Sequence, residues 1–441
     1  MTRKQRRKVK RFIRRSLPIF LVVVPFILLI GITVGMIQNH KKQTNVSDIH
    51  PETNPQESEK EPEPITASIL SAGDVIMHDP FLTSSYYKQE DGTFDYNPIF
   101  KYIKAKYADA DFTVINLEST ISDGNYKGYP RFRAPAAITA ALAKNSTDLC
   151  LLANNHIYDN YDAGMNMTVN AVQTNAMLYM GVRKATTEKT YLIQDINGIK
   201  VGFFNYVYDT GKSGTSTKSI NSIPVSNASA PLINTFNYGG LQSLYNEVKL
   251  GLEEMKSAGV EYTIAYIHWG AEYQTTENSR QREIAANLCE LGIDALIGGH
   301  PHVIQPVDLL TNAAGTHRMV CVYSLGNHLS NQYRERMVTT KPTGHTEDGL
   351  MVELILQKNK DNSVSLTKVE FIPTWVYRTP NVEDTDNPEF FIMPLDNPDT
   401  IVKTAGSLNI SADVKESLER TNEIIGAGVE KVKAALPITN P

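Results

Sequence analysis

Short apolar runs alternate with amphipathic stretches along most of the chain after residue 67. Over residues 241–255 the apolar positions recur every three or four residues, and Gly259 stands just beyond as a helix stop. A second stretch of this kind covers about residues 280–291 and ends at Gly292. These spacings predict two amphipathic helices. The apolar runs predict buried strands over residues 69–77, 112–117, 149–153, 201–206, 262–268, 295–297, 319–325 and 350–356.

The alternation of strands and helices predicts an α/β domain with a mostly parallel, buried sheet. The later strands are separated by turns rather than helices, so part of the sheet system is expected to be antiparallel. A Pro- and Asp-rich stretch at 381–399 predicts a loop, and residues 412–436 predict a helix. Whether this helix docks on the domain or binds a partner is left open by the sequence.

The first 37 residues follow a different pattern. Residues 1–15 hold nine Lys or Arg and no acid, and residues 17–37 hold no charged residue. A run of 21 residues is long enough for a helix to cross a hydrocarbon core of roughly 30 Å. Because such cations stay cytoplasmic, we predict a basic cytoplasmic segment (1–15), one transmembrane helix acting as an uncleaved signal anchor (16–37), and a main domain outside the cell membrane.

Residues 38–66 contain four prolines and five glutamates without apolar periodicity, which predicts a solvated spacer. It precedes a main domain at 67–380 and a C-terminal extension with a helix at 381–441. The formal charge of −5 combines +9 from residues 1–15 with −14 from the rest. Such a distribution argues against a nucleic-acid partner, whose binding needs positive charge on a folded face. The three cysteines are too few for a disulfide framework, and Cys150 and Cys321 lie in apolar runs where we expect them to be buried.

Polar residues able to bind metals follow the apolar runs repeatedly. Taken singly, each has a plainer explanation as a turn, a helix cap or a solvated charge. Ligands of α/β sheets, however, gather at the carboxyl ends of strands, and here the polar residues recur at most of these ends. In chain order they are Asp74, His78, Glu118, Asn155, His156, His268, Glu272, His300, His302 and Asn327.

The residue types in this series suit a two-metal centre. Two glycines introduce His300-Pro301-His302, an alternation that can place both imidazoles around one centre. Two-metal hydrolytic sites hold their ions about 3.5–4 Å apart and share a bridging carboxylate, a role that suits Glu118. Mixed nitrogen and oxygen ligands fit Mn²⁺, Fe or Zn²⁺ better than Ca²⁺ or Mg²⁺. The sequence therefore predicts two divalent transition-metal ions.

The ordered motifs, over about residues 68–380, resemble the CapA branch of the calcineurin-like metallophosphoesterases: Gly-Asp, Asn-Leu-Glu, Asn-Asn-His-x-x-Asp, His-Trp-Gly-x-Glu, Gly-Gly-His-Pro-His and Tyr-Ser-Leu-Gly-Asn. The resemblance implies a four-layer α-β-β-α sandwich with the site at one edge. It also implies a role in making or exporting capsular poly-γ-glutamate, with the subunits of the polymer synthase or exporter as partners.

The resemblance further implies a role for each residue. Asp74 would bind the first metal, Glu118 would bridge, and Asn155 and His268 would bind the second. His300 and His302 would serve one ion each. His156 would protonate the leaving group.

Supporting roles follow from the same resemblance. Phe132-Arg133-Ala134-Pro135 is also similar to a CapA element, so Arg133 would anchor an anionic group, with Arg131 beside it. Glu272 and Asn327 would support the ligands. His78 lies four residues after Asp74, whereas the usual phosphoesterase opening is Asp-x-His, and a glutamate replaces the usual bridging aspartate.

Two functions stay open at this point. The first is a metal-dependent hydrolase or transferase outside the membrane, acting on a phosphoester or a γ-glutamyl polymer. The second is a non-catalytic subunit of a membrane complex, whose metals order the fold or bind polymer carboxylates. The membrane anchor favours membership of a complex, and the nearly complete ligand set favours metal chemistry.

Overall fold

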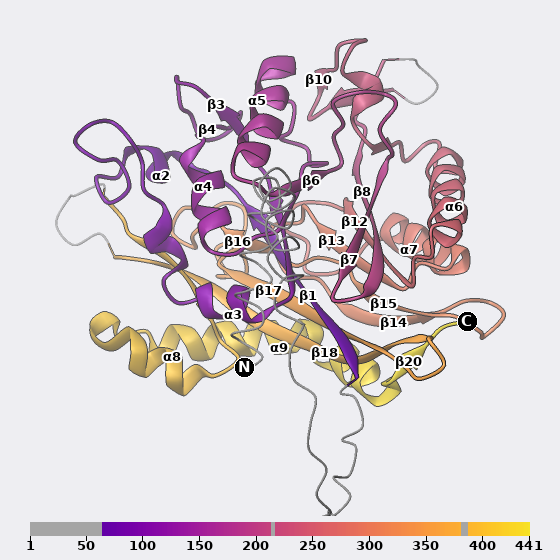
Figure 1. The fold of residues 1–441 in the computed structure, drawn as a ribbon. Coiled ribbons are helices and arrows are strands. Elements are labelled where there is room, and N and C mark those ends of the chain that lie inside the picture. The colour runs from indigo at the N-terminus through magenta and orange to yellow at the C-terminus, as the bar shows by residue number, and fades with distance from the viewer. Residues whose placement is uncertain (1–63, 213–216, 381–386) are drawn as a thin grey trace, which may run out of the picture. The chain divides into compact units, whose positions relative to one another are not determined.

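Two β-sheets face each other in the computed structural model, which describes residues 64–212, 217–380 and 387–441 (Figure 1). The predicted basic segment, the predicted transmembrane anchor and nearly all of the predicted spacer lie outside the described residues. In the part of the chain that is described, no helix has the length and apolar character needed to span a bilayer.

The larger sheet has nine strands. Its main path runs in the order β19 (Phe390–Pro394), β18 (Val364–Arg378), β17 (Asp348–Lys358), β1 (Ile65–Val75), β2 (Phe112–Leu117), β5 (Leu149–Leu151) and β6 (Leu178–Met180). Strands β1, β2, β5 and β6 are parallel, whereas β17, β18 and β19 pair antiparallel. Two short strands complete the sheet, β16 (Asn327–Leu329) beside β1 and β20 (Ile438–Thr439) beside β18.

The second sheet has seven strands. Its path is β11 (Thr235–Phe236), β8 (Ile199–Tyr208), β12 (Tyr262–His268), β13 (Ala295–Gly299), β15 (Arg318–Val322) and β14 (Val307–Thr311), with β7 (Tyr191–Ile196) beside β8. Only the β7–β8 and β14–β15 pairs of this sheet are antiparallel. The expected mixture of parallel and antiparallel pairing is confirmed. Smaller pairs are β3 (Thr120–Ser122) with β4 (Arg133–Pro135), and β9 (Ser219–Ile220) with β10 (Ile223–Pro224).

Helices cover the outer faces of both sheets (Figure 1). The nine-stranded sheet packs through Ile115 and its neighbours against α4 (Ala137–Lys144) and α5 (Tyr161–Thr174). The seven-stranded sheet packs against α6 (Gln242–Ser257) and α7 (Ser279–Leu291). Between the sheets lies a third apolar cluster that includes Ile69 and Ile264. The mixed α/β class is confirmed, with layers in the order helix, sheet, sheet, helix. Shorter helices are α2 (Asp79–Thr83), α3 (Lys104–Asp109) and α8 (Pro398–Ala405).

The two predicted amphipathic helices are confirmed as α6 and α7. Their stop signals act as expected, because Gly259 and Gly292 both adopt positive φ, 76° and 96°. Cys150 in β5 and Cys321 in β15 are buried, as predicted. Strand β18 has no counterpart among the predicted strands, because charged residues such as Lys368 interrupt its apolar pattern.

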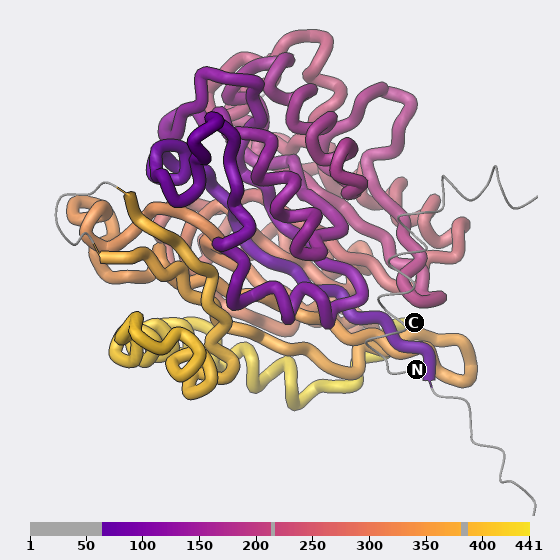
Figure 2. Tube along the Cα trace, turned by 60° about the vertical axis from the view of Figure 1, so that its left-hand side comes forward, coloured from indigo at the N-terminus to yellow at the C-terminus, as the bar shows by residue number. Residues whose placement is uncertain are grey.

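The C-terminal residues are built into the same sheet system. Strand β19 interrupts the stretch predicted as a loop, and β20 pairs with β18. The predicted helix is α9 (Ser411–Ala435), which runs alongside β18 in both views (Figures 1 and 2). Its Ile425 and Val432 enter the core between the sheets, and Nε of Arg420 lies 2.6 Å from Oδ2 of the buried Asp348. The alternative that the sequence left open is therefore decided in favour of docking on the domain.

Candidate metal centre

The carboxyl ends of parallel strands from both sheets meet at one place. Strands β1, β2 and β5 bring Asp74, Glu118 and Asn155, and strands β12 and β13 bring His268, His300 and His302. Two groups of three have donor atoms within 4.8 Å of one another, namely Glu118 with His300 and His302, and Asp74 with Glu118 and His268. Both groups share Glu118. The two groups hold the five predicted histidine and carboxylate ligands, and Oδ1 of Asn155, the sixth, lies 2.8 Å from Nε2 of His268.

Asp74 is held where β1 ends, with a completely buried side chain. Nδ2 of Asn116 donates to its Oδ1 at 2.7 Å and approaches Oε2 of Glu118 at 3.3 Å. The backbone N–H of His300 donates to its Oδ2 at 3.2 Å. Gly73 allows β1 to lie directly against the backbone at Gly326, since a Cβ on Gly73 would stand 2.1 Å from the carbonyl oxygen of Gly326. The carboxylate is therefore fixed from both sheets before any metal binds.

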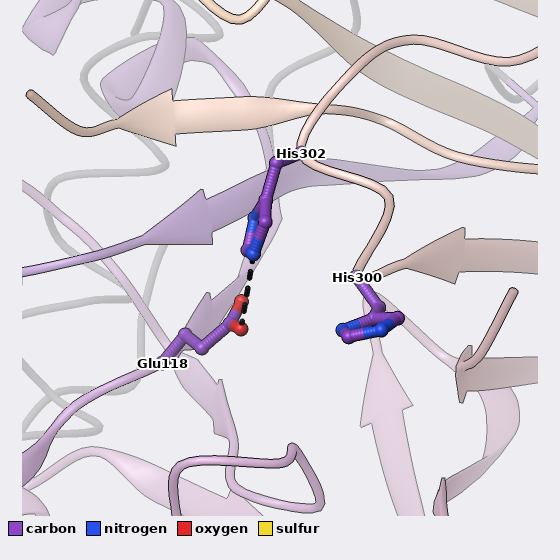
Figure 3. A group of neighbouring side chains, drawn as sticks. All are labelled: Glu118, His300 and His302. Atoms are coloured by element: carbon purple, nitrogen blue, oxygen red, sulfur yellow. Dashed lines mark ion pairs between the residues drawn. The ribbon is translucent and has the colours of Figure 1, made fainter. Parts of the chain in front are cut away.

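Glu118 has an unsatisfied carboxyl oxygen. Its side chain is completely buried, and Oε1 has no hydrogen-bond partner among the described residues. The nearest imidazole nitrogens are Nε2 of His268 at 3.5 Å and Nε2 of His302 at 3.9 Å. Figure 3 shows His302 facing Glu118, with His300 beside them. Burial raises the pKa of Glu118 well above its ordinary value, and the neighbouring Asp74 raises it further. A cation between these groups would supply the missing positive charge.

The histidines are suited to act as neutral ligands. Burial lowers the pKa of His268 and of His300 well below the ordinary value, which keeps a lone pair available on each ring. Nδ1 of His300 and Nδ1 of His302 are buried without a hydrogen-bond partner in the described part of the chain. Nδ1 of His302 lies 3.5 Å from Oδ2 of Asp74, and Nε2 of His268 lies 2.8 Å from Oδ1 of Asn155. Nitrogen and oxygen donors that face one another, several of them without a hydrogen-bond partner in the described residues, fit divalent transition metals.

The segment after β13 is strained. His300 and His302 adopt φ of 99° and 57°, a region that side chains with a Cβ rarely enter and that costs of order 1–3 kcal/mol per residue. Gly299 permits the approach to β1, because a Cβ there would lie 2.9 Å from Oδ1 of Asp74. The chain thus accepts unfavourable backbone geometry where both imidazoles are needed.

His156 is oriented by a carboxylate of its own. It donates from Nδ1 to Oδ2 of Asp159 at 2.7 Å, and the backbone N–H of Phe132 donates to the same oxygen at 2.7 Å. The ring of Phe132 meets that of His156 edge-on at 4.7 Å. His156 follows Asn155, whose Oδ1 lies 2.8 Å from Nε2 of His268, so it lies next to the candidate ligands. This arrangement leaves Nε2 of His156 to exchange a proton.

The comparison with known families adds to this geometry. The family described as "Bacterial capsule synthesis protein PGA_cap" matches residues 68–332. This chain belongs to the PGA_cap family. The resemblance to CapA proteins and to the metallophosphoesterase-like superfamily, inferred from the motifs, is thereby confirmed. All six candidate ligands lie inside the part of the chain that matches PGA_cap.

Two relatives are similar over most of the chain. The "PGA biosynthesis protein CapA" of Bacillus subtilis (strain 168) is 22% identical over 376 residues, which cover 84% of this chain and 83% of that protein. The "Capsule biosynthesis protein CapA" of Bacillus anthracis is 23% identical over 309 residues, 68% of this chain and 66% of that protein.

The supporting residues named from the sequence have different surroundings. His78 lies in neither three-residue group. Its Nδ1 accepts a hydrogen bond from the backbone of Asn331 at 3.1 Å, and its pKa is lowered to about 3, first by burial and then by His302 and His156. Asn327 pairs in register with Asp74. Nδ2 of Asn327 donates to Oε1 of Gln332 and to the carbonyl of Thr346, both at 2.9 Å, which ties the following loop to the site.

Glu272 and Arg133 border the site. Glu272 is exposed and precedes Tyr273, whose ring lies 6.1 Å from that of His302 between centroids. Arg133 pairs through its backbone with Lys127, at N–O distances of 2.8 and 3.0 Å. The Nε of Arg133 is buried without a hydrogen-bond partner among the described residues. Their roles toward a substrate stay predictions.

Three residues of the PGA_cap site were given no role by the sequence reasoning. Asn116 and Asp159 lie inside motifs that were recognised, yet nothing in the sequence shows that they contact Asp74 and His156. Tyr208 ends strand β8, and its hydroxyl lies 3.2 Å from Nε2 of His300. The strand-end signal that found the histidines would also have found this tyrosine.

Proposed function

We propose that this chain is a membrane-anchored protein of poly-γ-glutamate capsule biosynthesis or export, with a two-metal, hydrolase-like centre outside the membrane. The observation that carries the proposal is the pair of three-residue groups that share the buried Glu118. The names of the two relatives, which refer to PGA and capsule biosynthesis, support a role with the capsule polymer. The uncharged run at 17–37, which follows nine Lys or Arg residues, supports the membrane anchor and its orientation.

Each ligand has a definite place in the proposed centre. Asp74 and His302 would hold one ion and Asn155 and His268 the other, with Glu118 shared between them and His300 as a further ligand. This division follows the two short approaches, 3.5 Å between Asp74 and His302 and 2.8 Å between Asn155 and His268. Two divalent ions held by these residues would supply Lewis-acid chemistry toward a phosphoryl or carbonyl group and a water molecule.

His156 handles the proton in this proposal. In the cationic ring both nitrogens carry protons: Nδ1 donates to Asp159, and Nε2, which faces away from the carboxylate, would donate its proton to the leaving group. Arg133 anchors an anionic group of the substrate, because its guanidinium offers a fork of donors that matches a carboxylate or phosphate. The substrate class is an acidic γ-glutamyl polymer or a phosphoester of the cell envelope.

Metal content tests the centre directly. We expect the purified full-length protein to bind about two transition-metal ions per chain. Changing His300 and His302 together to alanine should abolish this binding, while His345→Ala, outside the site, should leave it unchanged. Metal content that survives the double change would refute the proposed centre.

Activity separates the two functions that the sequence left open. Hydrolysis of an aryl phosphate with added Mn²⁺, lost in His156→Ala with metal content retained, would support the hydrolase. The non-catalytic subunit would be supported if the metal-loaded protein were inert and polymer production still stopped when the protein was removed from cells. In that case it would act together with partner subunits of a synthase or exporter. Release of the domain by a protease added outside intact cells tests the proposed localisation.

A further inference from the structure

The loop between β3 and β4 carries cations on an otherwise acidic chain. Residues 127–133 contain Lys127, Arg131 and Arg133 and no acid, whereas the chain beyond residue 15 has a formal charge of −14. Neither arginine forms an ion pair with a carboxylate in the described part of the chain. Between them, Phe132 packs against His156 at 4.7 Å and against His78 at 5.2 Å. The loop therefore places two arginines that have no ion pair in the described residues beside the candidate metal centre, while Asp79 and Asp159 accept hydrogen bonds from its backbone at Gly128 and Phe132.

Arg131 is held in place by Tyr161, the first residue of α5. Its NH1 donates to the tyrosine hydroxyl at 3.0 Å, and its guanidinium carbon lies 5.7 Å from the centroid of the tyrosine ring. A guanidinium has five N–H donors, and this contact uses one of them. The remaining donors of this exposed side chain are available to a ligand. Arg131 is thus oriented without being neutralised.

Exposed tyrosines accompany this cation. Tyr129 and Tyr161 are 71% and 49% exposed, and they are among only seven large apolar or aromatic side chains exposed in the described residues. An exposed tyrosine offers a flat apolar face with one polar end, a combination enriched in binding surfaces.

Tyr161 has a positive φ, as His300 and His302 of the candidate metal centre do. Among the described residues, twelve other than glycine have positive φ, and eight of these are Asn, Ser or Ala. The other four carry rings: Tyr161, Tyr273, His300 and His302. Bulky residues at positive φ are outliers that persist where the surrounding structure fixes them, often at functional sites. Two of the four are candidate ligands and a third packs on His302, so Tyr161 shares this pattern with the site.

We propose that Arg131, oriented by Tyr161 and flanked by Tyr129, forms a subsite that binds a carboxylate of an acidic polymer chain while another part of that chain lies at the metal centre. This inference rests on the proposed function and adds its substrate-positioning residues. A guanidinium binds a carboxylate through two parallel hydrogen bonds, and the tyrosine faces pack against the methylene groups between successive carboxylates. The local positive charge attracts such a chain to this edge of the domain.

Binding of γ-linked glutamate oligomers of increasing length to the metal-loaded full-length protein tests the subsite. Arg131→Ala should weaken the binding of long oligomers by on the order of tenfold, the usual effect of losing a charged hydrogen-bonding pair. The binding of oligomers too short to reach from the metals should not change. Tyr161→Phe keeps the ring and removes the hydroxyl, so it should give a smaller loss. Arg280→Ala on α7 removes an exposed cation elsewhere and should have no effect.

The outcomes separate the subsite from the function beneath it. Equal affinity of wild type and Arg131→Ala for long oligomers, with wild-type binding intact, overturns the subsite alone. A wild-type protein that holds its metals yet binds no oligomer of any length overturns the polymer as substrate, and the subsite with it. A loss in Arg131→Ala that is the same for every oligomer length also contradicts the subsite, because it would place Arg131 at the metals.

Discussion

Oδ2 of Asp159 accepts hydrogen bonds from Nδ1 of His156 and from the backbone of Phe132, both at 2.7 Å. The backbone contact fixes the carboxylate, and the carboxylate in turn fixes the orientation of the His156 ring, with Nε2 turned away from it. Asp159 is therefore a positioning residue for the proposed proton donor.

We predict that Asp159→Asn lowers aryl phosphate turnover by roughly 10²-fold or more, because a neutral amide does not stabilise the cationic ring that donates the proton. The loss should be larger for poor leaving groups than for good ones, since only poor leaving groups need the proton. Steady-state rates over a series of aryl phosphates measure how the loss depends on the pKa of the leaving group.

Metal content and folding should be unchanged in Asp159→Asn, and Asp399→Asn on the exposed start of α8 is the matched control. A purely structural role for Asp159 would lower all rates equally, whatever the leaving group, and that result would contradict the assignment.

Glu118 links metal binding to stability. Burial and Asp74 raise its folded-state pKa above the ordinary value of 4.5, so the metal-free folded protein retains a proton that the unfolded chain releases. The contribution of Glu118 to stability is then greatest below pH 4.5 and is lost as the pH rises through the folded-state pKa. We predict that metal-free Glu118→Gln is more stable than metal-free wild type at pH 8. Between pH 4.5 and the folded-state pKa, the free energy of unfolding of the variant relative to wild type should grow by about 1.4 kcal/mol per pH unit.

Urea unfolding in the presence of a chelator, at pH 5 and pH 8, measures this difference. With saturating Mn²⁺ the order should reverse, because the ions stabilise only the protein that can bind them. If Glu118→Gln were as strongly stabilised by metal as wild type, Glu118 would not be the bridge.

Two glycines in α9 provide a matched pair for its docking on β14. A Cβ on Gly428 would lie 1.7 Å from the carbonyl oxygen of Val307, whereas a Cβ on Gly426 meets no atom within 4 Å. Gly426→Ala should raise the free energy of unfolding by about 0.5–1 kcal/mol, as alanine favours a helix. Gly428→Ala should lower it by about 1–3 kcal/mol, because the helix must move away from the strand.

Thermal and urea unfolding of both variants measure these opposite signs. Stabilisation by both substitutions would show that α9 is not seated on β14.

The sequence predicted the elements that have an uninterrupted signal. The strands ending at Leu117 and His268 were recognised from their apolar runs. The runs are long because every residue in these strands is buried. Helices α6 and α7 were recognised from one-sided apolar spacing and a glycine stop. Strand β18 was missed because it alternates charged and apolar residues around Pro373, and β19 because it lies in a stretch rich in Pro and Asp.

The sequence by itself determined the donor types, their position at strand ends and the CapA-like order of motifs, because these are local properties of short segments. It also supplied the membrane-anchor prediction, which lies outside the described residues. Only the tertiary structure decided that Glu118 is common to two groups of donors, that Asp159 orients His156, and that Tyr161 holds Arg131. These contacts join residues on different elements, and the packing of two sheets sets their distances. No spacing along the chain encodes such a distance directly.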